Sequence, residues 1–162
     1  LIGDFERISD HAVNLVESAE ELNAKGISFS AQGKKEIEVL YNALEEILQL
    51  TLSAMQDRDM AAAALVEPLE QVIDHLKKTI KMQHVIRLKN GQCTIEVGFV
   101  LNDILTCIER TSDHCSNIAA CILDMATNSF EIHEYLRHVK DGSKEEFNNN
   151  FKMYMEKYSL PI

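Results

Sequence analysis

The sequence predicts an all-α protein, an up-and-down antiparallel bundle of four long helices followed by a helical C-terminal extension. Apolar residues recur every three or four positions through most of the 162 residues. The chain contains only 6 Gly and 2 Pro, the residues that most often interrupt helices and mark turns. No segment alternates polar and apolar residues over the length of a strand, so we expect no β structure.

The first two helices are expected over residues 2–25 and 30–56. The first carries one apolar stripe, and Gly26 supplies its stop signal. The second opens with Ser30, a residue type that often caps helix N-termini, and has the clearest amphipathic pattern in the chain. The predicted core positions are Ile8, Ala12, Leu15, Ala19 and Leu22 in the first helix and Ile37, Leu40, Tyr41, Leu44, Ile47, Leu48, Thr51 and Met55 in the second.

The third helix is expected between Asp59 and the stop signal Asn90-Gly91, and the fourth from about Thr94 to residues 127–129. Pro68 lacks an amide donor, which predicts either a kink in the third helix or a delayed start. Gly98 lies inside the fourth helix, where glycine costs about 1 kcal/mol relative to alanine. Either a neighbouring helix approaches closely there, or the position is simply tolerated.

Two shorter helical segments complete the chain, over residues 130–140 and 143–158 on either side of Asp141-Gly142. We assign residues 1–128 to the bundle and residues 129–162 to a helical extension that packs on the bundle or on a partner. Leu1 lies inside an already periodic segment with no helix start before it. This opening predicts a fragment of a longer protein.

The charge balance limits the classes of partner. With 16 basic and 26 acidic residues, the formal net charge is 16 − 26 = −10. Because the basic residues are scattered among acids, nucleic acid is excluded as an expected partner. Divalent cations, in contrast, suit a chain that collects carboxylates at one point. The longest apolar run, residues 60–66, is too short to span a membrane.

The four cysteines, Cys93, Cys107, Cys115 and Cys121, show no C-x-x-C spacing. We interpret them as reduced core residues of a cytoplasmic protein, in preference to a disulfide framework or a zinc finger.

A polar motif occurs twice, on the first and fourth predicted helices. The string E-R-x-S-D-H-x-x-N occupies residues 6–14 and again residues 109–117. The matched positions are polar, so the repeat does not follow from the apolar pattern that all helical bundles share. In each copy Glu, Asp and Asn stand four residues apart, which aligns them on one helical stripe. The stripes consist of Glu6, Asp10 and Asn14, and of Glu109, Asp113 and Asn117.

These stripes predict a metal site. Like charges four residues apart repel, and a divalent or trivalent cation relieves that repulsion. The predicted ligands are Glu6, Asp10, Glu109 and Asp113, either as two equivalent sites or as one shared cluster. A third pair of the same spacing, Glu70 and Asp74, lies on the third helix. Further candidate ligands, or groups that support the ligands, are Asp4, Asn14, Asn117, Glu70, Asp74, His11 and His114.

His11 and His114 each directly follow the Asp of the motif, so their side chains point about 100° away from the stripe that contains this Asp. They are therefore expected beside the ligands rather than among them. A di-iron oxidase is disfavoured because no Glu is followed three residues later by His. Catalytic signatures such as G-x-S-x-G, H-E-x-x-H and a phosphate loop are absent, so we predict no enzyme. A metal-free interaction module with acidic contact stripes is a third interpretation.

The duplicated motif resembles the signature of the PhoU family, which has an acidic residue, Arg, an aliphatic residue, Gly, Asp and then His or Tyr in each three-helix repeat. Here Ser9 and Ser112 stand where the family usually has Gly. The resemblance is closer to the PhoU-like C-terminal domain of bacterial sodium/phosphate cotransporter-related proteins. It rests on the string H-V-I-R-L-K-N-G-Q-C-T at residues 84–94 and on tail segments at residues 133–137, 145–147 and 156–160.

This resemblance implies that residues 1–25 are the last helix of one repeat and that residues 30–128 form a complete second repeat. It implies multinuclear iron or zinc at Glu6, Asp10, Glu109 and Asp113, with help from Asp4. It also implies a regulatory role at the cytoplasmic face of the plasma membrane, modulating phosphate uptake. The expected partner is a membrane-embedded transporter portion of the same chain, with a homo-oligomer as a further possibility. The alternative is a free-standing PhoU-type negative regulator of a phosphate ABC transporter and its signalling.

Overall fold

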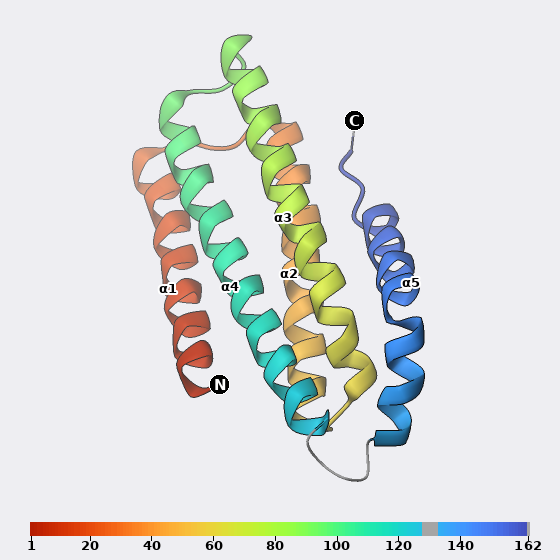
Figure 1. Ribbon diagram of the computed structural model, residues 1–162. Helices are drawn as coiled ribbons and strands as arrows, with labels where there is room; N and C mark the ends of the chain where they lie inside the picture. Colours follow the sequence, from red (N-terminus) through yellow and green to blue (C-terminus); the bar gives the residue numbers. More distant parts are fainter. Residues whose placement is uncertain (128–132, 162) are drawn as a thin grey trace.

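Five helices that run up and down make up the architecture of the computed structural model, which describes residues 1–127 and 133–161 (Figure 1). Side chains are described for residues 1–126 and 144–161. The helices are α1 (Ile2–Lys25), α2 (Ala31–Gln56), α3 (Met60–Lys89), α4 (Ile95–Thr127) and α5 (His133–Lys157). The described residues contain no strand, which confirms the predicted all-α class. None of the helices described is both long and apolar enough to cross a membrane.

Helices α2, α3 and α4 pack against one another and enclose the core. Helix α1 lies along the outer side of α4, and α5 lies along α3, as Figure 1 shows. The core is built from apolar residues at helical spacing, as the periodicity predicts. Its largest fully buried aliphatic side chains include Leu40, Ile47, Leu69, Ile73, Ile80, Leu105, Ile108 and Ile118.

The boundaries of α1 and α2 follow the predicted signals. Gly26 ends α1 in the left-handed conformation, with φ of 62°, and Ser30 caps α2 by accepting a hydrogen bond from the Gly33 amide at 3.1 Å. The predicted α1 stripe is only partly correct, because Ala12 and Ala19 are exposed. Helix α1 packs along a single neighbour, so the face that it buries is narrow.

One predicted helix break is wrong, and one of the two alternatives at Pro68 is excluded. Helix α3 starts eight residues before Pro68 and continues through it, so the proline does not delay the helix, whereas the alternative of a kink stays a prediction. Helix α5 likewise continues through Asp141-Gly142, where the sequence predicts a break between two shorter helices. One glycine inside a helix costs about 1 kcal/mol, which the packing of a long helix can offset. The beginning of the predicted segment 130–140 lies outside the described residues.

The C-terminal part of α5 belongs to the same core. Tyr154 is 1% exposed, and Tyr158 is buried and donates a hydrogen bond from its hydroxyl to Glu46. Burial raises the pKa of Tyr154 to about 12. The extension therefore packs on the bundle in this structure, although the proposed domain boundary at residue 128 stays a prediction.

The cysteines are all unpaired thiols, as predicted, but not all lie in the core. Cys107 and Cys115 are buried, Cys93 is half-buried and Cys121 is exposed. Burial raises the pKa of Cys115 to about 11, so this thiol stays protonated at neutral pH.

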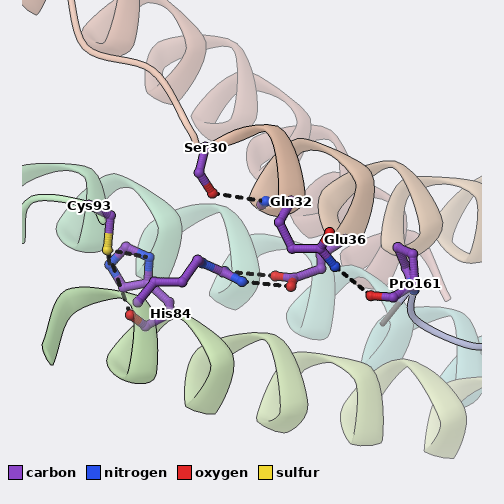
Figure 2. Close-up of polar contacts among 8 residues, drawn as sticks. Ser30, Gln32, Glu36, His84, Cys93 and Pro161 are labelled. Atoms are coloured by element: carbon purple, nitrogen blue, oxygen red, sulfur yellow. Dashed lines mark hydrogen bonds and ion pairs between the residues drawn. The ribbon is translucent and has the colours of Figure 1, made fainter. Parts of the chain in front are cut away.

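A buried ion pair joins α2 to α3 near the α3–α4 turn. The guanidinium of Arg87 donates two hydrogen bonds to the carboxylate of Glu36, at 2.6 and 2.7 Å, and the side chains are 10% and 3% exposed (Figure 2). Beside this pair, Gln32 donates to the backbone carbonyl of Pro161 and so ties the C-terminal tail to α2. The pair fixes how far α2 and α3 can slide along each other.

We predict that Glu36→Gln lowers the free energy of unfolding by about 3–5 kcal/mol, because it leaves the Arg87 charge buried and unpaired. Urea unfolding followed by circular dichroism measures this change. Glu38→Gln on the exposed face of α2 is the matched control and should stay within about 0.5 kcal/mol of the wild type. Equal effects of the two substitutions would contradict a special role for the buried pair.

Gly98 allows a close approach between α3 and α4. A Cβ atom at this position would lie 2.8 Å from Nε2 of His84, whose side chain is buried. The half-buried thiol of Cys93 lies 3.8 Å from the same imidazole ring. Of the two interpretations left open by the sequence, the close approach is therefore correct, and the neighbour is the His84 ring.

Gly98→Ala should destabilise the protein by about 0.5–2 kcal/mol even though alanine favours helices by about 1 kcal/mol, because the buried ring has to move. Thermal unfolding of this variant and of the double variant Gly98→Ala/His84→Ala tests the cause. In the presence of His84→Ala, the glycine substitution should become neutral or stabilising. Destabilisation that persists without the ring would point to another origin.

Candidate functional site

The two copies of the polar motif meet through their histidines. Helices α1 and α4 pack antiparallel, and the rings of His11 and His114 stack with centroids 5.9 Å apart. Nδ1 of His114 lies 3.0 Å from Oδ1 of Asp4, and this hydrogen bond lowers the pKa of Asp4. Nδ1 of His11 is buried and has no hydrogen-bond partner among the described residues. Burial, together with the charge on His114, lowers the pKa of His11.

The acidic stripes of the two copies have different surroundings. Glu6, Asp10 and Asn14 are exposed on α1. On α4, Glu109 and Asp113 are half-buried next to α3, whereas Asn117 is exposed. The tertiary structure therefore makes the two copies inequivalent, although their sequences match.

The α4 stripe lies beside the third acidic pair that the sequence indicated, Glu70 and Asp74 of α3. Glu70 forms a hydrogen bond with Asp113, and its charge interacts with that of Asp74. Glu67 interacts electrostatically with Glu70 and accepts a hydrogen bond from Ser116 of α4. We refer to Glu67, Glu70, Asp74, Glu109 and Asp113 as the acidic cluster.

Two lysines of α3 partly neutralise the acidic cluster. The ammonium group of Lys77 forms an ion pair with Glu109, and that of Lys78 lies 2.6 Å from Asp74. The Lys77 pair joins α3 to α4, whereas the Lys78 pair lies within α3 and is largely exposed. Lys77 therefore provides positive charge at a predicted metal ligand.

Glu70 carries the strongest sign of crowding among these carboxylates. Burial raises its pKa to about 7, and the negative charges of Glu67, Asp113 and Asp74 act in the same direction. A hydrogen bond between two carboxyl groups requires a proton on one of them. Near neutral pH, Glu70 is therefore protonated for part of the time and can then donate to Asp113.

The residues of the acidic cluster suit a metal by chemistry but not by their present arrangement. Carboxylate oxygens are ligands for hard cations. However, within residues 1–126 and 144–161, no three Asp, Glu, His or Cys side chains are arranged to hold one ion. Lys77 contacts Glu109, so a cation that used this carboxylate would first displace the ammonium group.

Three residues of this region, Glu67, Lys77 and Ser116, were not predicted from the sequence. Glu67 precedes Glu70 by three residues and Asp74 by seven, which places all three on one helical face. Extending the Glu70–Asp74 pair by one turn in each direction would have found both Glu67 and Lys77. Ser116 gives no comparable signal, because its role depends on how α4 packs against α3.

The protonation of Glu70 predicts a pH-dependent stability. An acid whose pKa rises from 4.5 to about 7 on folding stabilises the folded state at low pH, and this contribution is lost as the pH rises from 4.5 to 7. Glu70→Gln removes this pH-dependent loss of stability, because glutamine does not ionise. We expect this variant to exceed the wild type by roughly 1–2 kcal/mol at pH 8 and by much less at pH 5, after allowing for solvent screening.

Urea unfolding at both pH values measures this difference. Glu20→Gln, at an exposed position of α1, is the control and should shift stability equally at the two pH values. A Glu70→Gln effect that does not change with pH would contradict the raised pKa of Glu70.

Comparison with known proteins identifies the family of this bundle. The PhoU domain matches residues 37–122, more than half of the chain, and this match includes α3 and the whole α4 copy of the motif. The chain is 28% identical to PhoU homolog 1 of Thermotoga maritima, a phosphate-specific transport system accessory protein, over 87% of the chain. It is 24% identical to the PhoU homolog of Deinococcus radiodurans, which has the same description, over 80% of the chain.

The chain spans 60% of the length of each of these two relatives. No solved structure shows significant similarity to it. The family assignment therefore rests on the sequence match, and the helical bundle and the duplicated polar motif agree with it. The chain belongs to the PhoU family.

Proposed function

We propose that this chain is a regulatory domain that modulates phosphate transport. The transport would be of the phosphate-specific type that appears in the names of its two relatives. The observation that carries the proposal is the PhoU domain match, which covers the helices that contain the acidic cluster. The names of the relatives, accessory proteins of phosphate-specific transport systems, supply the process. In this role the protein acts by binding a transport component at the cytoplasmic face of the membrane, not by catalysis.

The relatives favour an accessory protein that acts on a separate transporter. The finer resemblance, to the C-terminal domain of a sodium/phosphate cotransporter, stays a prediction. It requires membrane-spanning segments encoded in the same reading frame. The gene sequence around this segment distinguishes the two hypotheses. Long apolar spans in the same reading frame would indicate a cotransporter domain, whereas a further soluble repeat would indicate an accessory protein.

Phosphate uptake in cells tests the shared part of the proposal. Deletion of the gene should change the rate of radiolabelled phosphate uptake by at least several-fold under phosphate-replete conditions, and the wild-type gene should restore it. A variant with Glu36→Gln, which we expect to be poorly folded, serves as a loss-of-function control. An uptake rate that is the same with and without the gene would contradict a role in phosphate transport.

We further propose that the acidic cluster binds a divalent or trivalent cation when Lys77 is displaced from Glu109. Support comes from the crowding of carboxylates around Glu70. Burial and then the neighbouring negative charges raise the pKa of Glu70, and a bound cation would relieve the repulsion among these charges. The resemblance to the PhoU family implies iron or zinc. An all-oxygen donor set favours manganese or iron over zinc. When bound, the cation would hold α3 and α4 together in place of the Lys77 ion pair.

Elemental analysis after reconstitution tests the cation proposal. We expect bound manganese or iron in the wild type and at least a tenfold lower affinity in Glu70→Gln/Asp113→Asn. Glu6→Gln/Asp10→Asn on α1 is the matched control: retained binding places the site on α3 and α4, and an equal loss indicates one cluster shared with α1.

Lys77→Gln should strengthen metal binding, because it frees Glu109, and added metal should then raise the melting temperature. No occupancy in the wild type or in Lys77→Gln would leave the metal-free interaction module.

A further inference from the structure

An apolar groove lies between α3 and α4, beyond the acidic cluster and towards the turn that connects the two helices. It has a volume of about 400 Å3, and its walls include Val85 and Leu88 from α3 and Ile95 and Phe99 from α4. Gly98 and His84 also line it, so their close approach shapes the groove. None of these residues belongs to the duplicated motif or to the acidic cluster.

The rim of the groove exposes large apolar side chains. Phe99 is 67% exposed, Ile95 62% and Val85 43%. Met82 adds a further exposed apolar side chain on α3 close to the rim in sequence. Single exposed apolar residues are common, but a group of them around a groove is typical of an interaction surface. An exposed aromatic residue is the kind of side chain that dominates binding energy at such surfaces.

The charges around the groove specify the partner further. In a chain with a net charge of −10, the residues that line the groove include no Asp or Glu. Lys81 lies at the groove, and its ammonium group donates to Oδ1 of Asn102 at 3.1 Å. Unlike Lys77 and Lys78, it has no carboxylate within ion-pair distance among the described residues. A carboxylate on a partner would therefore meet an available cation.

The geometry favours a helix as the occupant. Lys81, Val85 and Leu88 follow i, i+4, i+7 spacing on α3, and Ile95, Phe99 and Asn102 repeat it on α4. Two antiparallel helices with such facing stripes accept the apolar face of a third helix. A second copy of the chain fits less well, because two-fold symmetry would oppose identical surfaces, each with an unpaired Lys81, in a molecule that already repels itself.

We propose that this groove binds an amphipathic helix of a partner protein, with apolar anchors at i, i+3 or i+4, and i+7, and with an Asp or Glu that pairs with Lys81. The inference rests on the proposed function, which supplies the partner as a cytoplasmic segment of the phosphate transport system. The groove and the acidic cluster then use different parts of the same pair of helices, one for the partner and the other for a cation.

Binding of the full-length protein to the transporter of its own organism, and to overlapping peptides of about 20 residues from the cytoplasmic segments of that transporter, tests the proposal. We expect one acidic amphipathic peptide to bind and to compete with the transporter. Phe99→Ser should weaken both interactions at least tenfold. Lys81→Glu should weaken them and Lys81→Arg should restore them, and added salt should weaken wild-type binding more than that of Lys81→Gln.

Met153→Ser, at a position of α5 that is 46% exposed, is the matched control and should bind normally. Ile95→Ser provides a second groove variant if Phe99→Ser lowers the melting temperature. Equal transporter binding by the wild type and both groove variants overturns the groove proposal alone, whereas no binding by the wild type overturns the proposed function with it. Self-association that Phe99→Ser abolishes would instead identify a second copy as the occupant.

Discussion

The central position of α4 is the constraint on which the rest of the structure depends. This helix packs against α1, α2 and α3, so different faces of it contact three neighbouring helices. Successive residues on a helix point about 100° apart. Accordingly Asp113 meets Glu70 of α3, His114 contacts α1, and Cys115 is buried in the core. One turn of one helix thus contributes to three different contacts, and a change in its rotation would disturb all of them.

The α3–α4 pair combines two surfaces with opposite character. Around Glu70 and Asp113, carboxylates crowd together and two lysines only partly compensate them. Around Phe99, apolar side chains surround a groove that has a cation but no acid. Because both surfaces belong to the same rigid helices, anything that alters the packing of α3 on α4 at one surface is felt at the other.

Much of the fold could be predicted from the sequence, because helical periodicity and end signals are local. The predicted ends at Gly26 and Ser30 are correct for this reason. The delayed start at Pro68 and the break at Asp141-Gly142 were predicted wrongly, because tertiary packing sustains helices through residues that disfavour them in isolation. The α1 stripe was predicted too wide, because the sequence does not reveal that α1 packs along a single helix.

The candidate site could be predicted only in part. The duplicated motif identified Glu109 and Asp113, and equal spacing identified Glu70 and Asp74, but the sequence could not show that these two pairs lie together. The sequence also could not show that Glu6 and Asp10 are exposed whereas their counterparts on α4 are half-buried, because the two copies of the motif have the same residues at these positions. The Phe99 groove has no motif at all, since it arises where two stripes from different helices meet.

The buried pair of Glu36 and Arg87 has a consequence for how this protein can change over evolutionary time. Replacing either residue alone leaves an unpaired charge in the interior and destabilises the fold. Replacing both with well-packed apolar residues often leaves the stability unchanged or raises it. The two positions are therefore separated from their apolar alternative by an unfavourable intermediate. Descendants of this sequence should retain both residues or replace both. Homologues that keep only one of the two charged residues should be rare.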